Sequence, residues 1–367
     1  MTKLFEPLRV GRVELSNRIT LAPLTRFRAD DNHVPLPFVK EYYAQRASLP
    51  GTLLVTEATL ISARAGGYPN IPGIYNDAQI AAWKEVTDAV HAKGSYIYMQ
   101  IWALGRVAPP DGLKTMGDFV PVSSSATPFD GGAVPHALTE SEIQEWIQDY
   151  AQAAKNAIAA GFDGVEIHGA NGYLIDQFTQ DTCNKRTDAW GGSVENRARF
   201  ALEVTKAVVE AIGADRTGIR LSPFSIFQGM RMEDPVPQFT YLAEQLKSFK
   251  LAYAHVVEAR IAGNAEIEAS EKLDFFFKAY EQASPIMVAG GYKPDSAREA
   301  VDAVYKDYDV LIAFGRSYIA NPDLPFRVKS NVPLTPYDRD MFYRPKDPVG
   351  YIDYEFSDEF KAVKVEA

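Results

Sequence analysis

Residues 139–168 read TESEIQEWIQDYAQAAKNAIAAGFDGVEIH, a helical pattern followed directly by a strand pattern. Thr139 and Glu142 form the Ser/Thr-x-x-Glu signature of a helix N-terminus, and Gly161 is a typical helix stop. The apolar residues between them recur at the spacing of one helix face: Ile143, Trp146, Ile147, Tyr150, Ala154 and Ile158. The run Phe162–His168 that follows is short and largely apolar, as strands buried on both faces are. The stretch predicts one helix–strand unit.

The same alternation recurs along the chain, with further helical patterns at Asp77–His91 and Ser193–Ile212. Eight segments have strand character: Arg18–Leu24, Thr52–Glu57, Tyr96–Trp102, Phe162–His168, Thr217–Ser222, Ala252–Glu258, Pro285–Ala289 and Asp309–Phe314. Strands that alternate with helices form a parallel sheet, and eight such units favour a closed barrel over an open sheet. The glycine motifs of open nucleotide-binding sheets, G-x-G-x-x-G and G-x-x-x-x-G-K, do not occur in the sequence. We therefore expect an α/β fold, a (β/α)8 TIM barrel.

Two segments lie outside the repeated units. Leu8, Val10, Val13 and Leu15 alternate around Gly11-Arg12, which predicts an N-terminal hairpin that closes one end of the barrel. Residues 103–138 hold five prolines and five glycines and follow the third strand. We expect a long loop there, on the catalytic face, as is typical of a functional lid. Because no linker rich in Gly or Ser interrupts the chain, residues 1–367 are predicted to form a single domain.

Composition narrows the class of protein. Apolar residues make up 46% and charged residues 23%, which is typical of a soluble globular protein. The net charge of −10 and the lack of a basic stripe exclude nucleic acid and anionic membranes as partners. The single cysteine, Cys183, excludes an internal disulfide and an iron–sulfur cluster, and the five histidines are too scattered to predict a metal site. Without a signal-peptide pattern at its start, the chain is predicted to be a cytoplasmic enzyme.

Chemistry in such a barrel lies where strands end and the following loops begin. Taken alone, His168 is best interpreted as a satisfied buried histidine. Arg220 is more informative, because a guanidinium inside a barrel needs an anion nearby: Glu57, Glu166 or a ligand. Gly290-Gly291 after the seventh strand and Gly315-Arg316 after the eighth lie where barrels bind phosphate. Together these residues predict a ligand that carries a phosphate.

Four separated motifs give a specific resemblance. They are Ser16-Asn17-Arg18-Ile19-Thr20-Leu21-Ala22-Pro23-Leu24-Thr25-Arg26; His168-x-x-Asn171-x-Tyr173-Leu-Ile-Asp-Gln-Phe; Asn184-x-Arg186-x-Asp188-x-x-Gly191-Gly192-Ser193-x-Glu195-Asn196-Arg197; and Phe314-Gly315-Arg316-x-x-Ile319-Ala320-Asn321-Pro322-Asp323-Leu324. Together they resemble the old yellow enzyme family of flavin ene-reductases. The His168/Asn171 pair, in place of two histidines, resembles the yeast and fungal branch of that family.

The resemblance implies a noncovalent FMN and a nicotinamide hydride donor, NADPH or NADH. The positions that match the family's cofactor-binding residues are Pro23, Thr25, Ala58, Gln100, Arg220, Gly291, Gly315 and Arg316. Of these, the resemblance implies that Gln100 pairs with the pyrimidine edge of the flavin. It implies that Arg220 faces the region where negative charge collects on reduction and that Arg316 holds the phosphate.

The resemblance also implies a reaction, the reduction of a small-molecule α,β-unsaturated carbonyl compound. Nicotinamide reduces FMN, which passes hydride to the β-carbon of the substrate. His168 and Asn171 bind the carbonyl oxygen while Tyr173 protonates the α-carbon, so these three residues are the implied catalytic set. Tyr68, Trp102 and Tyr343 match positions that line the substrate pocket. The expected enzyme is an NADPH dehydrogenase type of ene-reductase, working as a monomer or homodimer.

Two other interpretations stay open at this point. One is a flavin-bound isomerase, which returns the hydride to its substrate and releases an unreduced product. The other is a non-catalytic flavin or steroid binder. The phenol of Tyr173 argues against both, because it is a proton donor with an ordinary pKa of about 10 and lets a reduction finish.

Overall fold

Eight parallel strands form a closed barrel in the computed structural model, which describes residues 2–262, 265–266 and 270–365. In order around the barrel they are β3 (Ile19–Leu21), β4 (Leu53–Val55), β6 (Tyr96–Trp102), β9 (Gly164–Gly169), β10 (Thr217–Leu221), β11 (Tyr253–Val257), β14 (Ile286–Ala289) and β15 (Val310–Phe314). The ring closes because β15 pairs with β3 and β4 pairs with β6. The eight predicted strands and the TIM-barrel fold are confirmed.

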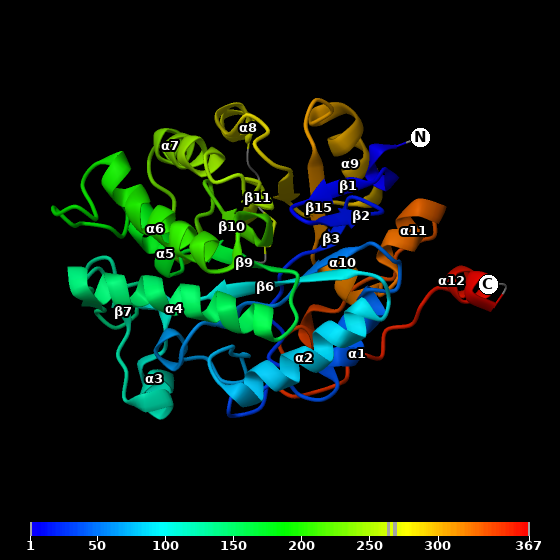
Figure 1. Cartoon of the computed structure of the whole chain (residues 1–367), viewed down its shortest axis with the longest axis horizontal. Coiled ribbons are helices and arrows are strands. Elements are labelled where there is room, and N and C mark those ends of the chain that lie inside the picture. Colours follow the sequence, from blue (N-terminus) through cyan, green and yellow to red (C-terminus); the bar gives the residue numbers. More distant parts are fainter. Residues whose placement is uncertain (1, 263–264, 267–269, 366–367) are drawn as a thin grey trace.

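Helices cover the outside of this barrel (Figure 1). They are α1 (Val39–Arg46), α2 (Asp77–His91), α4 (Glu140–Ala159), α5 (Leu174–Thr179), α6 (Val194–Ile212), α7 (Val236–Lys247), α8 (Asp274–Tyr280), α9 (Pro294–Glu299), α10 (Arg316–Ala320), α11 (Leu324–Ser330) and α12 (Asp358–Val365). The capping box of Thr139 and Glu142 is present at the start of α4. Within the described ranges, no helix has the length and apolar character needed to cross a bilayer.

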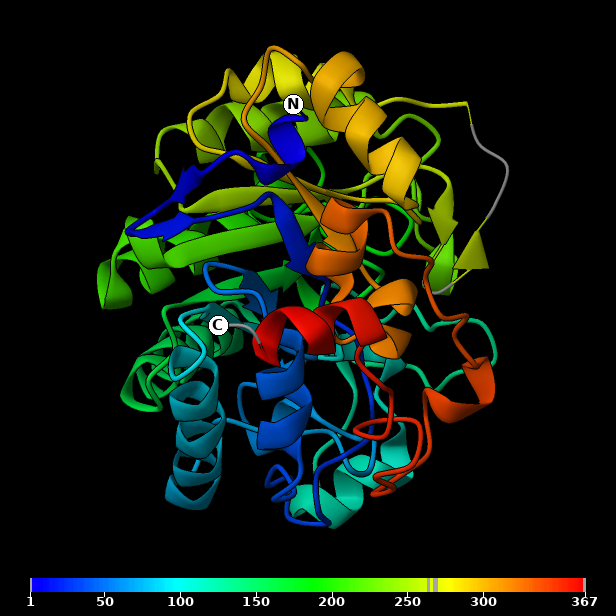
Figure 2. The same ribbon diagram turned by 90° about the vertical axis from the view of Figure 1, so that its right-hand side faces the viewer.

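The N-terminal hairpin fills one end of the barrel. Strands β1 (Leu8–Val10) and β2 (Val13–Leu15) pair antiparallel, with Leu8 opposite Leu15 and Val10 opposite Val13. These four side chains pack into one buried cluster with the inward side chains of the barrel strands, which include Leu53, Tyr98, Tyr253, Met287 and Leu311. The hairpin (blue) and the short strands β12 (Ile261–Ala262) and β13 (Ala265–Glu266) lie at opposite ends of the barrel (Figure 2). The prediction of a closing hairpin is confirmed.

The long segment after β6 has structure of its own. It contains α3 (Pro110–Gly117) and the strands β7 (Val122–Ser123) and β8 (His136–Ala137), which pair with each other. The buried guanidinium of Arg106 donates to the carbonyl oxygens of Thr127 and Pro128, and also to that of Gln228 in the loop after β10. The segment therefore packs beside the barrel as the predicted long connection after β6, with short elements of its own. Its function as a lid stays a prediction.

The hairpin can dock only because its turn carries glycine. Gly11 has a φ of +55°, and a Cβ atom there would lie 2.0 Å from the carbonyl oxygen of Asp215. Gly131 is the matched control, since it has a φ of +71° but open space around the position of a Cβ. We expect Gly131→Ala to cost about 1–2 kcal/mol of unfolding free energy through left-handed strain alone. Gly11→Ala should cost clearly more, and urea unfolding of both variants measures the difference. Equal losses would contradict a close approach at Gly11.

Candidate active site

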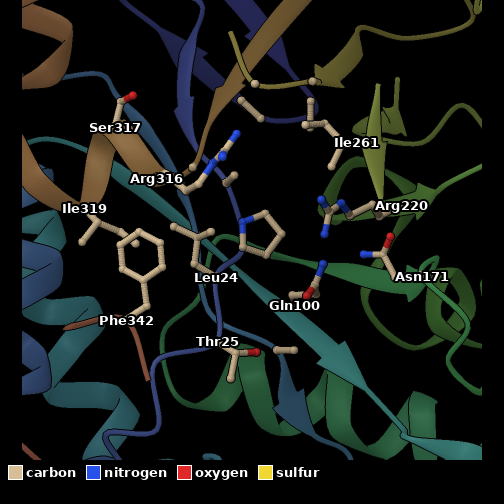
Figure 3. Close-up of a pocket in the computed structure, with 18 of the residues that line it drawn as sticks. Leu24, Thr25, Gln100, Asn171, Arg220, Ile261, Arg316, Ser317, Ile319 and Phe342 are labelled. Atoms are coloured by element: carbon tan, nitrogen blue, oxygen red, sulfur yellow. The ribbon is translucent and has the colours of Figure 1, made fainter. Parts of the chain in front are cut away.

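One pocket lies at the carboxyl ends of the barrel strands. Residues Ala22–Thr25 after β3, Ala58 after β4, Gln100 and Trp102 of β6, His168 of β9, Arg220 of β10, Gly290–Lys293 after β14 and Gly315–Ser317 after β15 line it. Asn171, Tyr173, Phe227, Ile261, Ala289, Ala313, Ile319, Tyr337, Phe342 and Tyr343 complete the lining. In Figure 3, Gln100, Asn171 and Arg220 face the centre from one side, and Arg316 lies on the opposite side. All but one of the site residues predicted from sequence meet here.

Tyr68 is the exception, because it does not line this pocket. It is partly buried and packs against a hydrophobic cluster that contains the pocket residues Ala58 and Trp102, as Tyr173 also does. The ring is close enough to Tyr173 to act on the pKa of its phenol. In this structure Tyr68 therefore packs against the same cluster as three pocket residues but does not line the pocket itself.

A buried carboxylate organises the floor of the pocket. The Oε1 atom of Glu166 accepts a hydrogen bond of 2.7 Å from Nε2 of Gln100. Its Oε2 atom accepts from the hydroxyl of Tyr253 at 3.0 Å and from Nδ1 of His255 at 2.8 Å. Burial alone would raise the pKa of Glu166, but His255, Arg220 and Gln100 together lower it, so the carboxylate stays ionised. Because Nε2 of Gln100 is held by Glu166, the amide oxygen of Gln100 is available to a ligand.

Arg220 places a buried guanidinium in the pocket, and the described residues leave part of its hydrogen-bonding capacity unused. Its side chain lies beside His168 on the neighbouring strand, and its Nε atom is buried with no hydrogen-bond partner among the described residues. Burial lowers the pKa of Arg220, while the charge of Glu166 opposes this. The prediction that an acid faces Arg220 is correct for Glu166 as a nearby charge. The hydrogen bonds of Glu166, however, go to Gln100, Tyr253 and His255. Arg220 is therefore available to bind an anionic or carbonyl group of a ligand.

His168 is neutral and presents one defined nitrogen to the pocket. Burial lowers the pKa of His168 well below its ordinary value, and the charges of Arg220 and His255 lower it further. Its Nδ1 atom accepts a hydrogen bond from the backbone N–H of Ala170 at 3.3 Å. The proton therefore belongs on Nε2, because a neutral imidazole carries one N–H and one acceptor. His168 is thus a neutral donor that can bind a carbonyl oxygen.

Asn171 and Tyr173 lie on the short loop between β9 and α5. Asn171 and Gly172 both have left-handed backbone conformations, with φ values of +56° and +76°. The ring of Tyr173 packs edge-on against Trp102, with centroids 4.7 Å apart, and against His168 at 4.9 Å. Burial raises the pKa of Tyr173 above its ordinary value, so the phenol carries its proton at neutral pH. Two donors and one weak acid therefore face the same space.

The opposite end of the pocket is built from glycines and cations. Gly291 follows β14 with a φ of +65°, and Gly315 precedes α10. A Cβ atom at Gly315 would lie 3.3 Å from the side chain of Leu24, so a larger residue would crowd this end of the pocket. Arg316 and Lys293 line the same end, and the Arg316 guanidinium lies over the ring of Tyr337. Bare backbone N–H groups and a guanidinium are the donors that proteins use to bind phosphate.

The C-terminal segment supplies Tyr343, which the family resemblance predicted, and Phe342, which the sequence did not reveal. Two buried arginines that follow β3 hold it in place: Arg26 donates to the carbonyl oxygens of Phe342 and Gly350, and Arg28 to those of Phe342 and Asp347. These bonds bring Phe342 and Tyr343 to the pocket. The sequence also did not reveal Phe227, Ile261 and Tyr292. These residues lie in segments with no helical or strand periodicity. The one sequence feature that could have pointed to Phe342 is its position beside Tyr343, in an adjacent pair of aromatic residues.

The fold and this site define a barrel oxidoreductase with a pocket for a phosphate-bearing aromatic cofactor. The chain belongs to the NADH:flavin oxidoreductase / NADH oxidase family, whose family model matches residues 3–335. It is 40% identical to an Old Yellow Enzyme from Pichia sp. AKU4542, with a TM-score of 0.89 over 97% of this chain and 94% of that one. The Old Yellow Enzyme homologue from Zymomonas mobilis is also 40% identical, with a TM-score of 0.88 over 96% and 99% of the two chains.

A curated fungal relative is closer in sequence. Chanoclavine-I aldehyde reductase fgaOx3 from Penicillium roqueforti is 68% identical over 369 residues, covering 100% of both chains. The comparisons confirm the predicted family, the noncovalent FMN with NAD(P)H as hydride donor, and the assignment as an NAD(P)H-dependent oxidoreductase. They fit FMN-dependent ene-reduction of small enones better than isomerisation.

Behind the pocket, Glu57 is a buried carboxyl group with an unusual pKa. Burial raises the pKa of Glu57 from 4.5 to about 7, although Arg26, Arg28 and Tyr43 act in the opposite direction. Its Oε2 atom is buried without a hydrogen-bond partner among the described residues. Because the pKa is higher in the folded chain, protonation of Glu57 stabilises the fold below pH 4.5. That stabilisation is lost as the pH rises through 7.

We therefore expect Glu57→Gln to change the pH dependence of stability. The amide is neutral at every pH, so the variant avoids the cost of a buried charge above pH 7. Between pH 5 and pH 8 its unfolding free energy, relative to the parent, should rise by roughly 2–3 kcal/mol. Chemical unfolding at both pH values measures this change, with Glu14→Gln on the exposed face of β2 as the control. A difference that does not vary with pH would contradict the raised pKa.

Proposed function

We propose that this ene-reductase acts on α,β-unsaturated aldehydes, with Tyr173 as the proton donor and with His168 and Asn171 as the carbonyl-binding pair. The observation that carries the proposal is the meeting of a neutral His168, Asn171 and a protonated Tyr173 over one pocket. An aldehyde is favoured because the relative that is 68% identical is named as an aldehyde reductase.

The residues present fit FMN. The unpartnered Nε of Arg220 and the amide oxygen of Gln100 suit the polar edge of an isoalloxazine, and Pro23, Thr25 and Ala58 would lie beside the ring. Gly291, Gly315 and Arg316 would hold the phosphate, in a cradle that lacks side chains at both glycines. When bound, FMN supplies the hydride that NADPH or NADH donates and that the substrate β-carbon receives.

His168 and Asn171 prepare the substrate for this step. The Nε2–H of His168 and the side-chain amide of Asn171 would both donate to the aldehyde oxygen, which withdraws electrons from the β-carbon. Since His168 is neutral, it binds the oxygen without giving up its proton. Trp102 and Tyr343 line the remaining space, and Tyr68 packs against the cluster that contains Trp102. The donors are most effective as negative charge develops on the oxygen.

Tyr173 completes the reduction. Its phenol keeps a proton at neutral pH and lies in van der Waals contact range of His168, so it can donate to the α-carbon of a substrate bound by His168. A positioned general acid of this kind contributes about 10²–10⁴-fold in rate. An isomerase has no need of this proton, which is the chemical reason why reduction is favoured here.

Three further predictions belong to this proposal. Residues 1–367 act as one FMN-binding domain, because every residue of the pocket comes from one continuous barrel and its C-terminal segment. The enzyme works as a monomer or homodimer, and the described residues of one chain line its pocket. A cytoplasmic location is supported by the single cysteine, Cys183, which is buried against Ser123.

The first test of the proposal separates the acid from a pocket filler. Tyr173→Phe keeps the ring that packs on Trp102 and His168, so FMN content and flavin reduction by NADPH should stay near the parent values. Reoxidation by 2-cyclohexenone should slow by about 10²–10⁴-fold. Stopped-flow absorbance at the flavin band measures both half-reactions. Tyr150→Phe in α4 is the control, because its hydroxyl is buried away from the pocket. Parent reoxidation in Tyr173→Phe would exclude Tyr173 as the acid.

The second test concerns carbonyl recognition. A phenolate such as that of 4-hydroxybenzaldehyde resembles the oxygen that His168 and Asn171 would bind. Asn171→Gly removes the amide and keeps the left-handed backbone accessible. Loss of one donor to a charged oxygen should cost about 1.5–3 kcal/mol, which raises the dissociation constant roughly ten- to a hundredfold. Spectral titration of the flavin measures this constant. Unchanged affinity would refute the assignment of Asn171.

A further inference from the structure

The loop that carries Asn171 and Tyr173 needs an external support. Its two consecutive left-handed residues, Asn171 and Gly172, form a shape that non-glycine residues rarely adopt. One support comes from β10, where the hydroxyl of Ser222 accepts the N–H of Asn171 at 2.8 Å. The remaining contacts come from α5, the helix that begins directly after Tyr173.

Both ends of Gly172 are held by side chains of α5. The N–H of Gly172 donates to Oδ2 of Asp176 at 2.8 Å, and its carbonyl oxygen accepts from Nε2 of Gln177 at 2.8 Å. Asp176 and Gln177 are both 0% exposed. Two buried polar side chains on one short helix therefore fix the peptide groups between the carbonyl-binding amide and the phenol.

The neighbours of Asp176 are both hydrogen-bond donors. Its Oδ1 atom accepts from Nε2 of Gln180 at 2.8 Å. The amide of Gln180 cannot turn round, because its Oε1 atom already accepts the N–H groups of Arg231 and Met232 at 2.9 and 3.0 Å. A side chain at position 176 with an N–H group on this side would therefore point one donor at another, the Nε2 group of Gln180. The ionised carboxylate satisfies both neighbours.

The same bonds reach the neighbouring loop after β10. Arg231 and Met232 lie in the loop between β10 and α7, which also carries the pocket residue Phe227. This loop lies against Gly172, where a Cβ atom would come within 2.9 Å of Gln228 and Met230. A continuous chain of hydrogen bonds thus joins the Asn171–Tyr173 loop to the neighbouring loop after β10, through Asp176 and Gln180.

We propose that Asp176 is a positioning residue for the reduction: its carboxylate, oriented by Gln180, holds the Asn171–Tyr173 loop so that the amide and the phenol face the substrate. The inference rests on the proposed roles of Asn171 and Tyr173. Burial raises the pKa of Asp176 to about 7, while Gln180, the N–H of Gly172 and Arg106 act to lower it. Experiments at pH 8.5 therefore test the ionised form.

A charge exchange between positions 176 and 180 tests this proposal. In Asp176→Asn the new amide can accept from Gly172 only by turning its NH₂ group toward the donor of Gln180. We expect weaker binding of 4-hydroxybenzaldehyde and slower reoxidation by 2-cyclohexenone, each by roughly ten- to a hundredfold. FMN content should stay at the parent level. Hydrogen–deuterium exchange of the peptide that covers residues 170–174 should become faster, in the FMN-free chain as well.

The double variant Asp176→Asn/Gln180→Glu provides the rescue. The carboxylate introduced at position 180 would accept from Arg231, from Met232 and from the amide introduced at position 176, so every donor meets an acceptor and one negative charge remains. Ligand affinity, reoxidation and exchange should return to within about threefold of the parent, because the two changes compensate each other. Gln180→Glu alone should be impaired, because it places two carboxylates together. Thr179→Val is the control, since the Thr179 hydroxyl donates to Ile175 within α5 and, among the described residues, to no group of the loop.

Each outcome decides the proposal. Parent behaviour in Asp176→Asn, or a double variant as impaired as the single one, overturns it. If Asp176→Asn does not fold, a folded double variant with parent exchange supports the proposal, and failure of both variants to fold overturns it. Failure of the proposed function is distinguishable, because it would show as a parent protein that does not bind 4-hydroxybenzaldehyde. The exchange measurements would still report on the loop.

Discussion

Closure of the parallel barrel is the constraint on which the rest of the structure depends. Once β4 pairs with β6 and β15 pairs with β3, all eight strands point the same way and their carboxyl ends surround one opening. Side chains far apart in the chain, such as Thr25, His168 and Arg316, then face a common space. The apolar hairpin fills the other end of the barrel, so only one end is left for a ligand.

Buried charges then orient the polar groups of the pocket before any ligand arrives. Glu166 fixes the amide of Gln100, and the N–H of Ala170 fixes the tautomer of His168. Arg220 keeps an unsatisfied Nε atom among them. Burying such polar groups costs free energy unless they have hydrogen-bond partners. The partners found here leave one hydrogen-bonding atom of each group facing the pocket. Donors that need no reorientation are the arrangement that stabilises developing charge most effectively.

Ionic side chains also hold the irregular segments around the opening. Arg26 and Arg28 bind backbone carbonyls of the C-terminal segment, Arg106 binds those of two loops, and Asp176 binds the N–H of Gly172. Backbone that is neither helix nor strand must find other hydrogen-bond partners when it is buried. These long or charged side chains supply them, and in doing so they set the shape of the substrate side of the pocket.

The sequence by itself determined the eight strands, the main helices, the closing hairpin and the residues at the strand ends. Each of these follows from local periodicity, caps and motifs, and a closed barrel brings strand ends together whatever the details of packing. Only the tertiary structure decided that Phe227, Ile261 and Phe342 line the pocket and that Tyr68 does not. It also decided that Glu166, among the residues that the structure describes, bonds to Gln100 and not to Arg220. Those features depend on contacts between segments far apart in the chain, and such contacts leave no periodic pattern in either segment.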